Sequence, residues 1–235
     1  MTPAQRFSND GFLTLQSVLD ADSCQTLSSR LRIEGRHSAG ARNLLRDDRM
    51  RKLAASLQSR LGQDGLLPHT HRPVQCTYFE KSVDRNWIVP MHRDESIPVA
   101  ARVAHAELQG WSVKDGTLHV VAPASLLARL VAVRIHLDDC SEDDGPLCVI
   151  PGSHRRDTAG AAPVTCTASR GDALVMSPLL LHASSKATGQ SRRRVLHFLF
   201  GPSSLPWGLR WPEIDHDSPG GQTASRPAAH QPLKE

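Results

Sequence analysis

The sequence predicts a mainly β fold in which helices near the N-terminus flank a jelly roll. Helical patterns are concentrated before residue 70, and short strand-like segments separated by turn residues follow. No regular alternation of strands with helices is visible along the chain. Many short strands with intervening turns are typical of a sandwich or a barrel rather than of βαβ units.

The first expected elements are a strand and two helices. Residues 10–20 (DGFLTLQSVLD) have the pattern of a short strand followed by a turn, and residues 20–35 that of a helix. The clearest helix covers residues 46–62, where apolar side chains recur at spacings of three, four and seven. The members of this apolar stripe are Met50, Leu53, Ala54, Leu57 and Leu61. We expect the stripe to face the protein core.

Seven later segments have strand character. They are residues 74–81, 87–94, 116–121, 130–139, 146–153, 171–178 and 193–200. Turn residues separate them, and SEDDGP at 141–146 has the composition of a hairpin turn. In 130–139, apolar residues alternate with a second face that carries Arg134 and His136.

The chain length is suited to one domain. A chain of 235 residues can bury a core that needs no disulfides. We expect a single domain over residues 1–214, with a helical part over 1–70 and a jelly-roll core over 71–214. Residues 215–235 lack apolar periodicity and are expected to form a flexible tail.

Composition limits the expected cellular location and the expected binding partners. Five cysteines at irregular spacing suggest neither a disulfide framework nor a zinc pattern, which favours a reducing, cytoplasmic location. The first residues show no signal-peptide pattern, and no apolar run is long enough for a membrane span. The net charge is only +4 and aromatic content is 4%, so neither a nucleic acid nor a membrane is an expected partner. A small-molecule substrate is expected, whereas no pattern specifies an oligomeric state.

Three His-x-acid pairs are candidates for metal binding. They are His92/Asp94, His105/Glu107 and His136/Asp138. Chance accounts for about one such pair in a chain of this composition, so the motif alone is weak. Residues i and i+2 share one face of a strand but lie about 200° apart on a helix.

Local context separates these pairs. His105 lies in RVAHAELQGW, which has a helical pattern and would make a poor clamp. His136 lies on the polar face of a strand, where it is a candidate ligand or part of a solvated face. His92 ends an apolar strand that runs into a polar loop, the setting in which ligands often occur.

One histidine and one carboxylate leave the 2-His-1-carboxylate arrangement of non-haem iron oxygenases one ligand short. Candidates for the second histidine are His154, His182 and His197. A keto-acid co-substrate would also need a cation, and Arg193 begins a strand eleven residues after His182. Arg194 is its rival, because strand alternation places the two arginines on opposite faces and does not choose between them.

Four segments together resemble the phytanoyl-CoA dioxygenase family. They are NWIVPMHRDESI, IHLDDCSEDDGPLCVIPGSHRR, GDALVMSPLLLHASS and RRRVLHFLFGPSSLPWGLRW. The resemblance covers roughly residues 7–211, including DGFLTLQSVLDADSCQTL near the start. It implies an Fe(II)/2-oxoglutarate-dependent dioxygenase that also uses O2, on a cupin-like double-stranded β-helix.

The resemblance assigns His92, Asp94 and His182 as iron ligands. Halogenating relatives have a small residue in place of the carboxylate. Because this chain keeps Asp94, the resemblance implies hydroxylation, or a related C–H oxidation, of a small organic substrate coupled to formation of succinate and CO2.

For the co-substrate, the resemblance places Arg193 at the C5 carboxylate of 2-oxoglutarate with the Ser184 hydroxyl beside it. Gln75 resembles a family position near the co-substrate. Arg134 and His197 are the candidates for contact with the substrate, and both have an alternative interpretation as hydrogen-bonded interior residues.

Two other functions remain open from the sequence. The first is a metal- or ligand-binding module without turnover, because fold alone does not establish function. The second is a cupin-like metal isomerase, which would need neither Arg193 nor Ser184.

Overall fold

The computed structural model describes residues 1–33, 40–155 and 161–214. The helices are α1 (Pro3–Asp10), α2 (Ala21–Arg30), α3 (Asp48–Gln63) and α4 (Ala124–Leu127), with 3-10 turns η1 (Leu44–Arg46) and η2 (Glu142–Asp144). The strands are β1 (Phe12–Leu15), β2 (Gly40–Ala41), β3 (His71–Lys81), β4 (Val89–His92), β5 (Ser96–Pro98), β6 (Gln109–Lys114), β7 (Thr117–Val121), β8 (Val131–His136), β9 (Leu147–Val149), β10 (Val164–Cys166), β11 (Ala173–Met176), β12 (His182–Ser184) and β13 (Arg193–Pro202).

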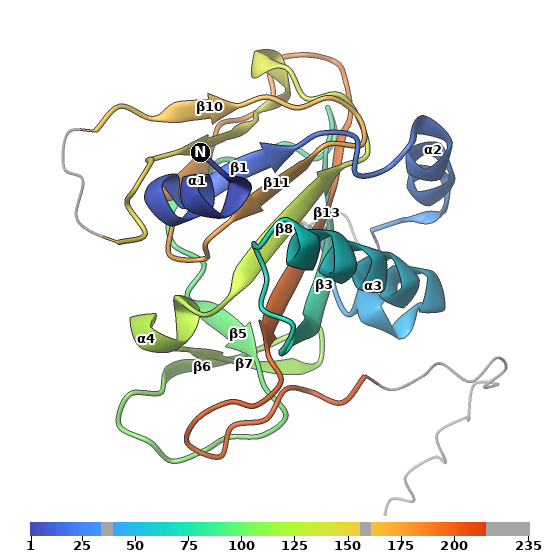
Figure 1. The fold of residues 1–235 in the computed structure, drawn as a ribbon. Coiled ribbons are helices and arrows are strands. Elements are labelled where there is room, and N and C mark those ends of the chain that lie inside the picture. Colours follow the sequence, from blue (N-terminus) through green and yellow to red (C-terminus); the bar gives the residue numbers. More distant parts are fainter. Residues whose placement is uncertain (34–39, 156–160, 215–235) are drawn as a thin grey trace, which may run out of the picture.

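Within this part of the chain, the strands form three antiparallel sheets (Figure 1). The largest has the order β1-β11-β8-β13-β3-β2, the second β10-β9-β12-β4 and the third β5-β7-β6. Neighbouring strands are often distant in the sequence, as in a jelly roll. The prediction of a mainly β jelly roll with N-terminal helices is therefore confirmed.

Two apolar clusters lie on the two faces of the large sheet. One contains alternate residues of β8, such as Val133 and Ile135, together with the stripe of α3. The other contains Ala132 of the same strand together with residues of the smaller sheets, such as Val149 and Ile97. The large sheet is thus covered by helices on one face and by the smaller sheets on the other, which is the arrangement seen for α3 in Figure 1.

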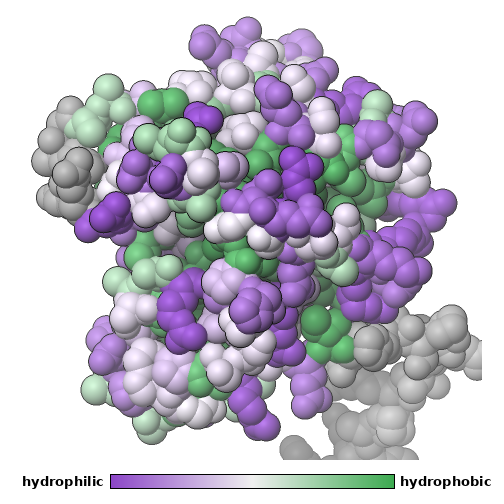
Figure 2. All heavy atoms as spheres, viewed as in Figure 1, coloured by the Kyte–Doolittle hydropathy of each residue, from purple (hydrophilic) through white to green (hydrophobic). Residues whose placement is uncertain are grey.

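The expected helices and their core-facing stripe are present. α3 buries Met50, Ala54, Leu57 and Leu61, and the Asp47 side chain accepts a hydrogen bond from a backbone N–H at its start. Figure 2 shows hydrophilic side chains over much of the helix-bearing side, with hydrophobic ones visible between them. The α2 helix is shorter than expected, because the chain is already extended at Leu31.

The first helix is not apparent from the apolar pattern. α1 buries none of its residues, so it has no core-facing stripe to detect. It is held by local signals instead: a capping box between Thr2 and Gln5, Pro3 in the first turn and Gly11 in the left-handed conformation at its end.

Two local predictions are wrong. Residues 141–146 do not close a hairpin, because β8 joins the large sheet and β9 joins the four-stranded sheet. The turn is instead η2, capped by Ser141 and ended by Gly145. The segment around His105 is a turn rather than a helix, in which the His105 ring accepts a hydrogen bond from the N–H of Glu107.

The expectation for residues 215–235 lies outside the described residues. In the described part of the chain, no helix is both long enough and apolar enough to span a bilayer.

Candidate metal and co-substrate site

A chamber of about 390 Å³ lies between the large sheet and the four-stranded sheet. Its walls come from β3, β8 and β13 on one side and from β4 and β12 on the other. The candidate residues of the sequence reach this chamber from both sheets.

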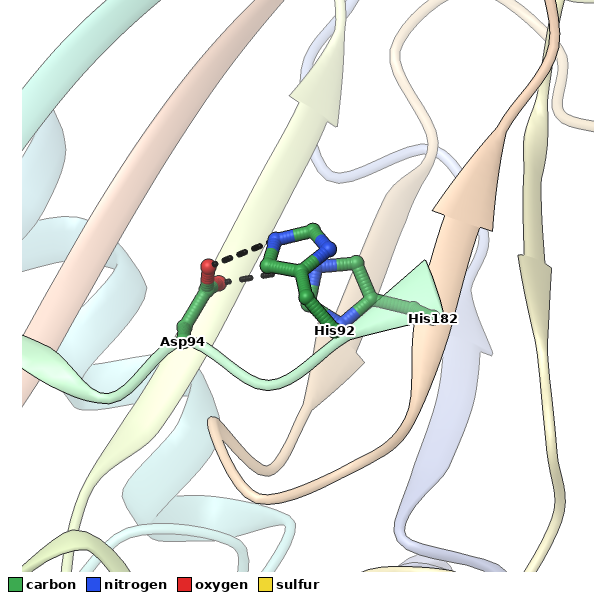
Figure 3. Close-up of side chains that lie close together, drawn as sticks. All are labelled: His92, Asp94 and His182. Atoms are coloured by element: carbon green, nitrogen blue, oxygen red, sulfur yellow. Dashed lines mark ion pairs between the residues drawn. The ribbon is translucent and has the colours of Figure 1, made fainter. Parts of the chain in front are cut away.

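His92, Asp94 and His182 converge at one point of the chamber wall (Figure 3). β12 pairs with β4 in a register that places His182 opposite His92, and the two ring centroids are 4.2 Å apart. The Asp94 carboxylate oxygens lie 3.4 Å from Nε2 of His92 and 3.8 Å from Nε2 of His182. Among the described residues, this is the one group of three or more His, Cys, Asp or Glu side chains close enough to share an ion.

Backbone contacts orient the two histidine rings and anchor the loop that carries Asp94. Nδ1 of His92 is 2.9 Å from the carbonyl oxygen of Pro90, and Nδ1 of His182 is 2.9 Å from that of Leu180. A carbonyl can only accept, so each Nδ1 carries a proton and donates, which leaves each Nε2 as a lone-pair donor facing the carboxylate. The N–H of Asp94 donates to the carbonyl of Pro178 and anchors the loop after β4.

The electrostatics of this group call for a cation. Two unprotonated Nε2 atoms and a carboxylate repel one another unless a proton or a metal lies between them. Burial would raise the pKa of the Asp94 carboxyl, but the imidazoles of His92, His182 and His197 lower it well below its ordinary value. Without a metal, a proton on Nε2 of His92 takes this place, and the hydrogen bond that it forms with Asp94 raises the pKa of His92, whereas burial lowers the pKa of His182. Two imidazole nitrogens and one carboxylate with space on the chamber side suit a non-haem iron.

Arg193 is a buried guanidinium that faces the same chamber. It lies at the start of β13, is 4% exposed and donates a hydrogen bond of 2.6 Å to the carbonyl of Gly145, while the side chains of Cys140 and Asp144 stabilise its charge from nearby. Its Nε is buried without a partner, and no described acidic side chain forms an ion pair with it. A carboxylate ligand would satisfy both the charge and the free donor.

Arg194 lies on the opposite face of β13. Its guanidinium holds Asp138 through contacts of 2.5 and 2.7 Å, and its own N–H donates to the same carboxylate. The Asp138 carboxylate thus neutralises the charge of Arg194, which is not available to a ligand. The pairing also occupies Asp138, which lies past the end of β8 and away from the candidate metal group.

The remaining predicted residues also lie at the chamber. Ser184 is buried on β12 two residues after His182, and Gln75 on β3 donates to the Thr77 hydroxyl at 3.1 Å. Arg134 and His197, neighbours on β8 and β13, are 3.2 Å apart between Nη1 and Nδ1. All four are part of the chamber lining.

Two other histidines stay outside the chamber lining. His154 packs against the turn at Gly11. His136 is buried on β8, and its Nδ1 has no hydrogen-bond partner.

Lys81 was not anticipated from the sequence. It is fully buried at the end of β3, opposite Arg193, and its ammonium donates to the Ser184 hydroxyl at 3.0 Å and to the carbonyl of Ser185. Burial, with help from Arg193 and Arg134, lowers its pKa to about 7. No local pattern marks this lysine, because its role depends on the pairing of β3 with β13.

A jelly roll that brings a His-Asp-His group and an unpaired buried arginine to one chamber has the features of a non-haem iron oxygenase. The chain belongs to the phytanoyl-CoA dioxygenase (PhyH) family, whose profile matches residues 7–195. This confirms the family that the sequence motifs indicated. No curated protein sequence matches the chain.

Several solved structures share the fold. The non-heme alpha-ketoglutarate-dependent epimerase SnoN from nogalamycin biosynthesis has a TM-score of 0.62 and 15% identity, over 93% of this chain and 90% of SnoN. HygX from Streptomyces hygroscopicus, solved with nickel and 2-oxoglutarate, has a TM-score of 0.59 and 16% identity, over 86% of each chain. AviO1 from Streptomyces viridochromogenes Tue57 has a TM-score of 0.59 and 22% identity, over 86% of this chain and 95% of AviO1. At these identities the likeness concerns the fold alone.

Proposed function

We propose that this protein is an Fe(II)- and 2-oxoglutarate-dependent oxygenase that hydroxylates a small organic molecule and releases succinate and CO2. The observation that carries the proposal is the presence, in one chamber, of three converging metal-donor atoms and of a buried arginine that forms no ion pair with a described acidic side chain. Family membership supports it. So do the iron-, nickel- and 2-oxoglutarate-bound structures of the neighbours SnoN and HygX.

His92, Asp94 and His182 would hold Fe(II) through two Nε2 atoms and one carboxylate oxygen. Bound there, the iron supplies the redox chemistry by which O2 converts 2-oxoglutarate to succinate and CO2 and inserts its other oxygen atom into a C–H bond. The protein's own task is to fix these ligands: the carbonyls of Pro90 and Leu180 orient the two rings, and the carbonyl of Pro178 anchors the backbone of Asp94.

Arg193 would bind the far carboxylate of 2-oxoglutarate. Its guanidinium is preorganised by the Gly145 carbonyl and retains free donors. The Ser184 hydroxyl, which accepts from Lys81, is then oriented to donate its own proton to the same carboxylate. Gln75 lines the chamber and is available to contact either the co-substrate or the substrate.

Hydroxylation rather than halogenation is proposed because Asp94 supplies a third protein ligand at the position where halogenating relatives have a small residue. The fold also serves other outcomes in the neighbours, since SnoN is an epimerase and SnoK a carbocyclase. Mass analysis of the product distinguishes these outcomes: hydroxylation adds one oxygen atom, epimerisation leaves the mass unchanged and carbocyclisation removes two hydrogens.

The test is anaerobic titration of the full-length protein with Fe(II) and 2-oxoglutarate, followed by exposure to O2. We expect a visible metal-to-ligand charge-transfer band that decays as succinate forms. Absence of the band, or a stable band without succinate, would favour a binding module. Arg194→Gln serves as the control for Arg193→Gln, because it removes the same charge from the opposite face of the strand.

A further inference from the structure

Arg134 is a buried cation with no counter-ion in the described structure. It lies in the middle of β8, is 8% exposed and contributes to the chamber lining. Its Nη1 lies 3.2 Å from Nδ1 of His197, its Nε is buried without a partner, and its guanidinium lies 5.9 Å from the centre of the Phe79 ring. No described carboxylate forms an ion pair with it.

Packing alone does not account for a guanidinium at this position. Burial of an unpaired charge is destabilising, and an apolar side chain of similar volume would fill the same space without that cost. His197 supplies no compensating charge, because an imidazole is either neutral or positive; its ring serves Arg134 only as a neutral hydrogen-bond acceptor. Phe79 contributes only the weaker attraction of an aromatic face.

The proposed co-substrate does not account for Arg134 either. The charges of Fe(II) and Arg193 together cancel those of Asp94 and the two carboxylates of 2-oxoglutarate. Arg134 therefore remains as a buried surplus positive charge. The other charged lining residues do not offset it: Arg42 pairs with Asp115, Arg93 donates to backbone carbonyls, and Lys114 and Glu95 carry opposite charges. An additional anion would neutralise this surplus.

We propose that Arg134 binds a carboxylate or phosphate group of the substrate, so that the enzyme acts on a small organic anion. The inference rests on the proposed function and specifies its substrate class. Chamber residues such as Trp87, Ile97 and Leu147 offer apolar contacts for the rest of the molecule. The substrate class is thus an organic acid with an apolar body, held by its charged end against β8.

The test compares anionic probes with neutral molecules of matched shape. The probes are phenylacetate and phenylacetamide, hexanoate and hexanamide, and phenyl phosphate and phenol. Binding to the full-length protein loaded with Ni(II) and 2-oxoglutarate is measured by calorimetry and by thermal melting. In the wild type, we expect at least one anion to bind about 10- to 100-fold more tightly than its neutral match, the range for a charge-assisted hydrogen bond.

Three variants assign this preference to Arg134. Arg134→Gln is expected to abolish it and Arg134→Lys to retain part of it. Arg102→Gln is the matched control, because Arg102 is an exposed cation that contacts Trp111 outside the chamber lining. The proposal is overturned if no anion is preferred by the wild type, or if Arg134→Gln keeps the wild-type preference.

Affinity for 2-oxoglutarate separates this proposal from its nearest rival. Arg134→Gln should bind 2-oxoglutarate as the wild type does. A tenfold loss would instead make Arg134 a co-substrate anchor and would overturn the proposal. If the wild type fails to bind Ni(II) and 2-oxoglutarate at all, the proposed function fails, and the probe comparison on the metal-free protein still tests Arg134.

A further measurement needs no ligand. Arg134→Met replaces the unpaired charge by an apolar side chain, so the metal-free variant should melt at a higher temperature than the wild type. A lower melting temperature would show that the guanidinium stabilises the fold and would contradict a role reserved for the substrate.

Discussion

His92 and His182 lie side by side on the paired strands β4 and β12, with their ring planes inclined at 51° and both Nε2 atoms near the Asp94 carboxylate. The two histidines come from distant parts of the chain, so their proximity depends on this strand pairing. Asp94 lies in the loop directly after β4 and is the third member of the group.

Removal of one member of this group should abolish tight metal binding. We expect His182→Ala to lower the affinity for Fe(II) by more than the roughly 10- to 100-fold that is typical when a residue hydrogen-bonded to a metal ligand is replaced. Metal content after anaerobic loading and desalting measures the effect.

His105→Ala is the matched control for this variant. It belongs to another His-x-acid pair, but its ring stacks on Trp207 at 4.7 Å and is not part of the chamber lining. Retention of a full equivalent of iron by His182→Ala would refute the ligand assignment.

Replacement of Arg193 should weaken 2-oxoglutarate binding, whereas replacement of Arg194 should lower the stability of the fold. Arg193→Gln is expected to raise the Kd for 2-oxoglutarate about 10- to 100-fold, because it removes a charge-assisted contact. Arg194→Gln should leave that Kd unchanged and lower the free energy of unfolding by about 2–3 kcal/mol, because it breaks the pair with Asp138.

Calorimetry on the Ni(II)-loaded protein gives the Kd, and denaturant unfolding gives the stability. The reverse pattern, with 2-oxoglutarate affinity sensitive to Arg194 alone, would exchange the roles of the two arginines.

Gly145 connects the turn after β8 to the proposed co-substrate site. It has a φ of +62°, and a Cβ there would lie 2.6 Å from the carbonyl oxygen of Ser185. Its own carbonyl accepts from Arg193. We expect Gly145→Ala to weaken 2-oxoglutarate binding and to lower stability by more than the roughly 1–2 kcal/mol of left-handed strain alone.

Gly116→Ala is the control for this effect. Gly116 also has a positive φ, of +76°, but a Cβ there meets nothing within 4 Å. The control should therefore show the strain without the loss of 2-oxoglutarate affinity. If both variants changed the affinity for 2-oxoglutarate equally, Gly145 would have no specific role in binding the co-substrate.

His136 should make the protein sensitive to mild acid. Burial, assisted by Arg134 and Arg193, lowers its pKa to about 3 from an ordinary value of 6.5. Between these two pKa values, His136 is protonated in the unfolded chain but neutral in the folded protein. The stabilisation is complete above pH 6.5 and is lost as the pH falls below it, at no more than about 1.4 kcal/mol per pH unit for this one group.

His136→Leu should reduce the slope of unfolding free energy against pH between about pH 6.5 and 5, a window above the ordinary range of carboxylates. Urea unfolding at a series of pH values gives that slope. An unchanged slope would mean that His136 is protonated in the folded state or that other histidines account for the acid sensitivity.

Local patterns in the sequence were sufficient for the fold class and for the two faces of β8. The alternation of Val133 and Ile135 with Arg134 follows from the two-residue period of a strand, and this period requires no knowledge of the partner strands. The same reasoning failed around His105, where a hydrogen bond from one backbone N–H to the ring replaces the expected helix. α1 escaped detection because it buries no apolar face.

The sequence by itself determined the jelly-roll class, the strand ends that carry polar side chains and, through its motifs, the family. Spacing and alternation alone left open which of His154, His182 and His197 would join His92 and did not choose between Arg193 and Arg194, whereas the family resemblance pointed to His182 and Arg193. Only the tertiary structure brings His182 next to His92 and Asp94 and places Arg193 at the chamber, because these positions depend on the register of β12 against β4 and on which face of β13 borders the chamber. Strand pairing between distant segments is set by packing of the whole sheet, and no local period encodes it.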